Sequence, residues 1–263
     1  MSGGKWQPQT ILRFIQSLPT STNVVRVDTD AGEGFLKVMG NPEGPHVLAC
    51  ELVGTILAEW LGLPTLDYAV IQVTTEDEIP LAGGGLAAPG PAFITKVENG
   101  FPWGGDEVTL RRIQNTQDIS RIVVLDTWIQ NCDRYRPAPN LRVNRDNVFL
   151  AWETEPERGL VLKAIDHTHA FTCGRDLTPR ISHEIRDTTV FGCFPEFESL
   201  LDREHVRSAA GRLGQMDNAQ AERYVAEVPK EWQVEESARE AWSTFIVERA
   251  TFVAANVTSW LWS

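Results

Sequence analysis

Three polar side chains in the middle of the sequence could act together in one reaction. Asp133 and Asn140 lie in the polar run 131–140, and Asp166 follows an apolar run. One carboxylate could accept a proton from a hydroxyl group, while an amide oxygen and a second carboxylate could hold Mg²⁺. Phosphoryl transfer requires such a set, because its catalysis consists mostly of positioning and charge neutralisation. Taken singly, Asp133 is more simply explained by a surface turn and Asp166 by a strand end, since short motifs often match by chance.

The segments around these residues predict the elements that would position them. Apolar residues at a helical period predict a helix over 117–131. Two β-rich runs, 147–152 and 160–165, predict a hairpin that ends at Asp166. Helix, polar loop, hairpin and carboxylate therefore follow in an order that offers the three polar side chains to one pocket.

A hairpin is also predicted near the N-terminal end of the sequence. The β-rich runs 24–29 and 35–39 flank a turn-rich centre that contains Gly32 and Gly34. These glycines could let backbone amides approach phosphate groups. A tight turn alone explains them equally well.

Lys37 and Glu51 form a second candidate group. Lys37 lies in the second strand of that hairpin, where a lysine usually faces solvent. Glu51 lies in an apolar helical stripe predicted over 47–60 and ended by Gly62, where a lone charge is usually solvated. A strand lysine followed by a helix glutamate is also the arrangement with which kinases hold the α- and β-phosphates of ATP.

The sequence predicts two parts that meet near residue 97. Residues 8–18 carry apolar side chains at a helical period and predict a helix, and the run 92–97 predicts a strand. The composition changes after this strand, so we place the parts at 1–97 and 98–263.

The order of the elements alone assigns a role to the strand before this boundary. The backbone of Phe93, Ile94 and Thr95 is predicted to act as a hinge that faces an adenine. No other feature of the sequence supports that role.

Composition and charge limit the classes of partner. The 263 residues are 42% hydrophobic and 23% charged, which is typical of a soluble globular protein. The net charge of −12 argues against nucleic acid as a direct partner and against an anionic membrane surface. No apolar run reaches the roughly 20 residues of a membrane span, and residues 1–10 lack an apolar leader.

The cysteines predict a cellular compartment. Cys50, Cys132, Cys173 and Cys193 form no CxxC pair and no dense framework. This pattern predicts a reduced, cytoplasmic protein.

Read together, these segments resemble the HipA-like kinases, in particular the compact HipA-like domain that occurs as a stand-alone bacterial protein. The resemblance covers roughly residues 8–255. The segments that carry it are Gly32-Glu33-Gly34-Phe35-Leu36-Lys37-Val38, Glu51, Leu61-Gly62-Leu63-Pro64, Asn131-Cys132-Asp133-Arg134, Asn140-Leu141, Ile165-Asp166-His167 and Val228-Pro229-Lys230-Glu231-Trp232. Phosphoinositide kinases share a similar Asp-Arg, Asn and Ile-Asp order, so the pattern defines a kinase clan better than it defines a substrate.

The resemblance implies an α+β, two-lobed protein-kinase-like fold with a small β-rich N-lobe and a larger, mainly helical C-lobe. Lys37 would hold the phosphates of ATP with Glu51 as its partner, and Asp133 would be the catalytic base. Asn140 and Asp166 would bind Mg²⁺. The family usually phosphorylates a Ser or Thr hydroxyl of a protein, and some members belong to toxin–antitoxin pairs. Because the sequence has no helix-turn-helix, an antitoxin-type partner would be a separate chain.

Two departures from the family pattern leave alternatives open. Asn140 follows Asp133 by seven residues, so Asn147 is a rival metal ligand. His167 and Thr168 stand where the Phe and Gly of the usual Asp-Phe-Gly would be, which argues against the ordinary activation-loop switch. The alternative functions are a nucleotide-binding pseudokinase or regulatory module, and a kinase of a small molecule or lipid.

Overall fold

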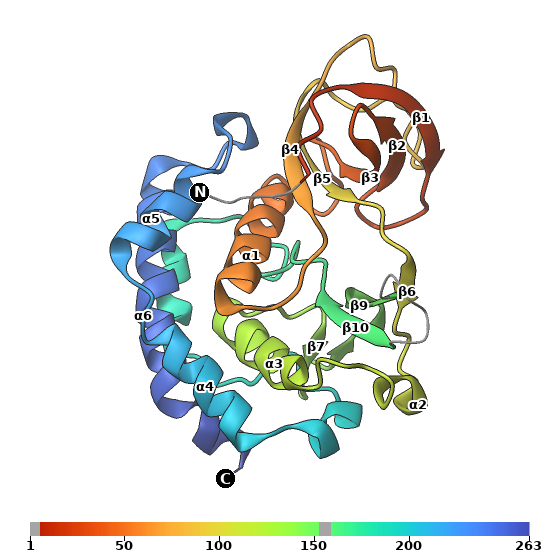
Figure 1. Cartoon of the computed structure of the whole chain (residues 1–263). Coiled ribbons are helices and arrows are strands. Elements are labelled where there is room, and N and C mark those ends of the chain that lie inside the picture. The colour runs from red at the N-terminus through yellow and green to blue at the C-terminus, as the bar shows by residue number, and fades with distance from the viewer. Residues whose placement is uncertain (1–5, 153–158, 263) are drawn as a thin grey trace.

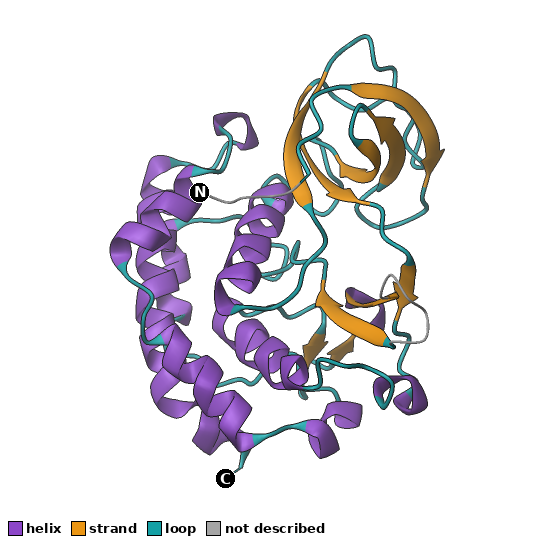
Figure 2. Cartoon of the chain, viewed as in Figure 1, coloured by secondary structure: helices purple, strands orange, loops and turns teal. Residues whose placement is uncertain are grey.

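The computed structural model describes residues 6–152 and 159–262. Figure 1 shows a β-rich N-terminal part, a central pair of helices and an outer layer of C-terminal helices. The larger group of strands lies at the upper right of the view, a smaller group lies below it beside α3 (Gln117–Ile129), and the long helices lie to the left (Figure 2). The predicted α+β class is confirmed by this arrangement. The predicted division of the chain at residue 97 stays a prediction.

The N-terminal part is built on one antiparallel sheet. Its 5 strands are ordered β1-β2-β3-β5-β4. Their bounds are Ile11–Ser17 for β1, Val25–Thr29 for β2, Gly32–Lys37 for β3, Tyr68–Val73 for β4 and Gly90–Lys96 for β5. Because side chains alternate along a strand, Leu36 points to one face and Lys37 to the other. The face of the sheet that carries Leu36 packs into an apolar core that includes Val25, Val27 and Ile94.

The first strand corrects one expectation of the sequence analysis. Residues 8–18 were expected to form a helix, but Ile11–Ser17 is the edge strand β1. Of its residues only Ile11 is buried, so the apolar spacing marks contacts along a bulged edge rather than one helical face. Pairing with β2 overrides the local pattern.

Helix α1, Val47–Leu61, packs against the Lys37 face of the sheet and is buried along most of its length. It ends where Gly62 takes a left-handed conformation with φ of 88°, which a glycine adopts without a steric penalty. Its Trp60 contacts Trp128 of α3, Gln117–Ile129, with ring centroids 5.7 Å apart. The predicted helix over 47–60 is therefore confirmed, and it links the sheet to the central core.

Short strands carry the polar loop that follows α3. Two of them, β7 (Tyr135–Arg136) and β8 (Arg142–Val143), form a small hairpin. The predicted second hairpin is confirmed as β9 (Val148–Trp152) paired with β10 (Leu160–Ala164), and β6 (Gly100–Pro102) extends it. A short helix, α2 (Glu107–Leu110), precedes α3.

Three helices form the outer layer: α4 (Arg203–Leu213), α5 (Asn218–Ala226) and α6 (Glu236–Leu261). The buried Arg249 of α6 donates to the carbonyl of Thr127 at 2.8 Å, near the end of α3. It also donates to the carbonyls of Ile185 and Asp187. The long helix therefore fixes the end of α3, after which the polar loop begins. In the part of the chain that the structure describes, no helix combines the length and apolar character needed to span a membrane.

Candidate active site

Lys37 joins three elements that are distant in the sequence. Its Nζ lies 2.7 Å from Oε2 of Glu51 on α1 and 3.2 Å from Oδ1 of Asp166, which follows β10. The side chains of Lys37 and Glu51 are 12% and 4% exposed, whereas that of Asp166 is 30% exposed. The structure thus brings these three predicted residues together, with Asp166 on the open side of the cluster.

The charges of this cluster stabilise one another. Burial alone would lower the pKa of Lys37, but the carboxylates of Asp166 and Glu51 outweigh it and hold that pKa above its usual range. Burial would likewise raise the pKa of Asp166, yet the Lys37 ammonium and the Thr168 hydroxyl hold it well below its usual range. For Glu51 burial dominates, and its pKa is raised despite Lys37. Lys37 and Asp166 are therefore charged at neutral pH, which is the state that binding of phosphate and metal requires.

The backbone at Asp166 is held in an uncommon conformation. Its φ of 57° is left-handed, a region that non-glycine residues rarely occupy. The Thr168 hydroxyl donates to Oδ1 of Asp166 at 2.6 Å, and the Asn131 amide lies 3.5 Å from its carbonyl oxygen. A strained backbone conformation persists where surrounding contacts fix the residue. Here it sets the direction in which the Asp166 carboxylate points.

Asp133 is held by a set of neutral amides and one arginine. Its Oδ2 accepts hydrogen bonds from Asn147 at 2.9 Å and from Asn144 at 3.0 Å. Its Oδ1 lies 2.7 Å from Nε of Arg142, whose side chain is 48% exposed. Neither Asn144 nor Arg142 was singled out from the sequence, because neither belongs to a recognisable spacing. The two amides therefore fix the orientation of the carboxylate, and the partly exposed Arg142 covers its second oxygen.

Arg134 fastens the loop that carries Asp133 to its surroundings. It is fully buried, and its Nε donates to Oδ2 of Asp126 on α3 at 2.7 Å. Its Nη1 donates to the carbonyls of Ile165, at 3.0 Å, and Asn147. Burial raises the pKa of Asp126 to about 6, against the opposing charge of Arg134. One guanidinium thus ties α3, the loop, the end of the β9–β10 hairpin and Asn147 together.

The structure separates the two candidate asparagines. Asn140 lies in the exposed turn between β7 and β8, and among the described residues it makes no hydrogen bond to Asp133 or Asp166. Asn147 is buried beside Asp133, and within the same described part its Oδ1 has no hydrogen-bond partner. The position of Asn147 beside Asp133 favours it over Asn140 as the rival that the sequence left open, and the metal-ligand role stays a prediction for both residues. The seven-residue gap reflects the β7–β8 hairpin, which carries Asn140 to its tip.

Asp166 and Asn147 each offer a side-chain oxygen of the kind that binds a divalent cation. Oδ2 of Asp166 also makes no hydrogen bond within residues 6–152 and 159–262, so one carboxylate oxygen and one amide oxygen are available. Mg²⁺ prefers such oxygen ligands, usually one or two carboxylates completed by water and phosphate. In the same residues no group of three or more His, Cys, Asp or Glu side chains is arranged to hold a metal by itself.

The predicted adenine-facing residues lie in the middle of the sheet. Strand β5 pairs with β3 on one side and β4 on the other, so the backbone groups of Phe93, Ile94 and Thr95 take part in the sheet. Ile94 points into the sheet core, whereas Phe93 and Thr95 share the face of Lys37. The backbone groups of these residues are thus engaged by the neighbouring strands, and the predicted adenine-facing role stays a prediction.

The two glycines have different local explanations. A side chain at Gly34 would collide with Ile94, at 2.6 Å, and with the Trp6 ring, so this glycine serves close packing inside the sheet core. Gly32 lies at the tight β2–β3 turn with φ of 103°. Neither observation supports the predicted contact with phosphate, and the tight turn explains Gly32.

Two histidines that follow Asp166 also join the site. His167 is fully buried: its backbone N–H donates to Oε1 of Glu51 at 3.3 Å, and its ring packs on Gly54 of α1. Burial lowers its pKa well below the usual range, so it is neutral. His169 lies 3.1 Å from Oε2 of Glu43, and its Nδ1 is 4.0 Å from Oδ2 of Asp133. The sequence motif located His167 but gave no signal for its contacts.

A disulfide joins Cys132 and Cys173, whose Cα atoms are 5.7 Å apart. The expectation that all four cysteines are reduced is therefore wrong for this pair. The two residues are separated by 41 positions, so no short spacing could reveal them.

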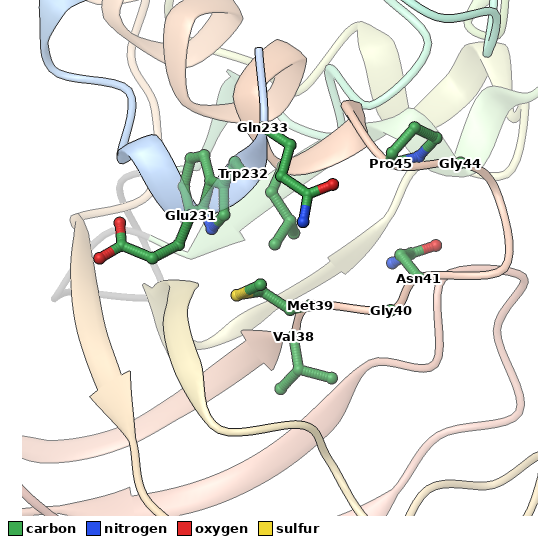
Figure 3. A pocket seen from close by; sticks show the side chains of 10 residues that line it. Val38, Met39, Gly40, Asn41, Gly44, Pro45, Glu231, Trp232 and Gln233 are labelled. Carbon is green, nitrogen blue, oxygen red and sulfur yellow. The ribbon is translucent and has the colours of Figure 1, made fainter.

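A separate cavity of about 370 Å³ begins one residue beyond Lys37. Glu231, Trp232 and Gln233 face the segment 38–41 across it (Figure 3). Lys37, Asp133 and Asp166 are not among its lining residues. The cavity therefore lies beside the cluster of Lys37, Glu51 and Asp166, and these side chains do not line it.

Comparison with known proteins gives a family and a fold. A family described as HipA-like kinase matches residues 27–262. No curated protein gives a significant match. Among solved structures, the chain is similar to the proinflammatory kinase CtkA of Helicobacter pylori, with 10% identity and a TM-score of 0.60 over 96% of this chain and 97% of that one. At this identity the similarity shows the fold alone, and it confirms the predicted kinase-like fold.

The kinase domain of Mycobacterium tuberculosis PknI also matches, with 14% identity over 95% of this chain and 99% of that one. Its TM-score of 0.28 is too low to support any argument.

Proposed function

The chain belongs to the HipA-like kinase family, and from this premise we propose that it transfers the γ-phosphate of ATP, with Mg²⁺, to a Ser or Thr hydroxyl of a protein. The observation that carries the proposal is the contact of Lys37 with both Glu51 and Asp166. It joins a strand lysine, a helix glutamate and a strand-end aspartate, as nucleotide binding by a kinase requires.

Lys37 and Glu51 form the phosphate-binding part of the proposed site. The ammonium of Lys37 remains charged because two carboxylates raise its pKa. Glu51 is buried and fixes the direction of Lys37, whereas the more exposed Asp166 can turn toward a metal. When ATP binds, we expect Lys37 to exchange its contact with Asp166 for phosphate oxygens.

Asp166 and Asn147 are the residues that would hold Mg²⁺, through Asp166 Oδ2 and Asn147 Oδ1. The ion would neutralise charge on the phosphates. Arg134 supports this proposal, because it ties together the backbone at Asn147 and at Ile165, the residue before Asp166.

Asp133 would orient the acceptor hydroxyl and take its proton. Asn144 and Asn147 hold one oxygen of this carboxylate, so the other is the one directed to the acceptor. Arg142 covers that second oxygen in this structure, but an ion pair with an exposed arginine contributes little free energy and is readily displaced by a substrate.

Replacement of Asp133 tests the proposal. Asp133→Asn keeps the shape of the side chain and removes its basicity, so phosphate transfer should fall by roughly 10²–10⁴-fold while nucleotide affinity changes little. The measurement is transfer of labelled phosphate from ATP with Mg²⁺, to the protein itself or to a mixture of candidate protein substrates. Arg142→Ala is the matched control and should retain transfer.

Three results would decide between the alternatives. Equal activity of Asp133→Asn and the wild-type protein would remove Asp133 from the mechanism. Tight nucleotide binding without transfer to any acceptor would identify a pseudokinase, and transfer only to a small molecule or lipid would replace the protein substrate. An antitoxin-type partner stays a prediction, which co-purification with a separate chain would test.

A further inference from the structure

The Cys132–Cys173 disulfide spans the two segments that carry the acids of the site. Cys132 directly precedes Asp133, and Cys173 lies seven residues after Asp166. Their Cα separation of 5.7 Å is in the middle of the range of roughly 4.4–6.8 Å that disulfides span. The bond can therefore form without moving the backbone away from the arrangement described above.

Noncovalent contacts also join these two parts of the chain: the N–H of Phe171 donates to the carbonyl of Ile129 at 2.5 Å, and Arg134 donates to the carbonyl of Ile165. The contacts made next to the two acids themselves are longer: the Asn131 side chain lies 3.5 Å from the carbonyl of Asp166, and Nδ1 of His169 is 4.0 Å from Asp133. The segment after β10 also contains two further left-handed residues, Phe171 with φ of 67° and Cys173 with φ of 53°. A strained segment needs firm attachments to keep one conformation, and the disulfide supplies a covalent one.

The two cysteines differ in how easily a reagent can reach them. Cys173 is half-buried, whereas Cys132 is buried next to Asp133. The unpaired cysteines are poor competitors, because burial raises the pKa of Cys50 to about 12 and that of Cys193 to about 11. Thiols with such pKa values form little of the reactive thiolate at neutral pH.

We propose that Cys132 and Cys173 form a reversible redox modification site whose disulfide holds the Asp133 loop and the segment after Asp166 in the assembled arrangement. The co-reactant is a low-molecular-weight disulfide such as oxidised glutathione. The Cys173 thiolate attacks one of its sulfur atoms and releases one small thiolate. The Cys132 thiolate then attacks Sγ of Cys173 and releases the second. Two protein thiols lose two electrons and two protons, and the small disulfide is reduced to two thiols.

The proposal has a structural and a catalytic consequence. Closing a loop of 41 residues restricts the unfolded chain, so oxidation should raise the melting temperature by roughly 5–10 °C. The catalytic consequence rests on the proposed kinase function: with Asp133 and Asp166 held together, the oxidised form should transfer phosphate faster than the reduced form.

The test uses the full chain equilibrated with reduced and oxidised glutathione at a series of ratios. Free thiols are alkylated, and peptide mass mapping identifies the linked pair. We expect one linkage, between Cys132 and Cys173, that disappears as the ratio becomes more reducing. Hydrogen exchange should be slower at 167–174 in the oxidised form. Because these readouts need no activity, a chain without phosphate transfer would overturn the proposed function and leave this test decisive.

Two cysteine variants, one in the disulfide and one outside it, serve as matched controls for this test. Cys173→Ser should show neither the linkage nor the redox-dependent change in melting temperature, whereas Cys193→Ser should behave as the wild-type protein does. Because Cys173 is half-buried, its replacement by serine should leave the fold intact. Absence of the linkage at every glutathione ratio would overturn the proposal, as would linkage with unchanged hydrogen exchange and melting temperature.

Discussion

Two ion clusters of this molecule contain similar charges in different surroundings. Lys37 contacts Glu51 and Asp166 at the edge of the site, where Asp166 is partly exposed. Arg134 contacts Asp126 behind the site, and both side chains are fully buried. A fully buried ion pair is inaccessible to a ligand, so its role is structural. A cluster with one open member can exchange a partner, so it can bind.

The difference between the clusters lies in what each cation contacts besides carboxylate. Arg134 also donates to two backbone carbonyls and therefore fixes chain segments relative to one another. Within residues 6–152 and 159–262, the ammonium of Lys37 makes hydrogen bonds to side chains only. We therefore expect loss of Arg134 to affect folding and loss of Lys37 to affect function.

The largest effect is expected from Arg134→Met. The change leaves Asp126 without its counter-ion and the carbonyls of Ile165 and Asn147 without a donor, so the free energy of unfolding should fall by about 3–5 kcal/mol. Urea denaturation measures this loss. The control, Arg142→Ala, removes an exposed ion pair and should cost less than about 1 kcal/mol. Similar losses of unfolding free energy in Arg134→Met and Arg142→Ala would contradict the structural role of the buried pair.

Lys37→Met should show the opposite pattern. Phosphate transfer should fall by about 10²–10³-fold, as when one preorganised donor is lost from an active site. The loss of stability should be smaller than for Arg134→Met, because Asp166 is partly exposed and burial already raises the pKa of Glu51 toward protonation. Steady-state transfer and urea denaturation of the same preparation separate the two effects. Full activity would remove Lys37 from the site.

The pH dependence of stability should distinguish the buried Arg134–Asp126 pair from the Lys37 cluster. The pKa of Asp126 is about 6 in the folded chain, above its value of 3.8 when unperturbed, so the folded chain binds this proton more tightly. Its contribution to stability is present below about pH 4 and is lost as the pH rises through about 6, a change of roughly 3 kcal/mol.

The measurement compares the wild-type protein with Asp126→Asn between about pH 4 and pH 7. The free energy of unfolding of the wild-type protein should fall relative to that of Asp126→Asn as the pH rises to about 6, and the difference should then stay constant. A constant difference over the whole range would show that Asp126 has an ordinary pKa.

The two asparagines give the smallest expected effect. Asn147→Ala should weaken Mg²⁺-dependent nucleotide binding by roughly 10–100-fold, since it removes a proposed ligand and a hydrogen bond to Asp133. Asn140→Ala changes an exposed turn and should have no measurable effect. Titration calorimetry with and without Mg²⁺ compares them, and the reverse ranking would return the ligand role to Asn140.

The sequence predicted the elements whose pattern is local. The apolar stripe of α1, the β9–β10 hairpin and the order of Lys37, Glu51 and Asp166 follow from periodicity and spacing. Edge pairing of β1 and the disulfide depend on contacts between distant positions, which no local pattern contains.

The outward position of Asn140 could not be predicted for a related reason. Spacing from Asp133 cannot show that residues 137–141 turn outward between β7 and β8. Similarly, the order of strands in the sequence does not show that β5 lies between β3 and β4, where its backbone is fully paired.

A crystal structure with Mg²⁺ and a non-hydrolysable ATP analogue tests the central claim most directly. The account predicts phosphate oxygens at Nζ of Lys37 and a metal ion bound by Asp166 and Asn147. A nucleotide bound elsewhere, such as in the cavity beside Trp232, with Lys37 still paired only to Glu51 and Asp166, would contradict it.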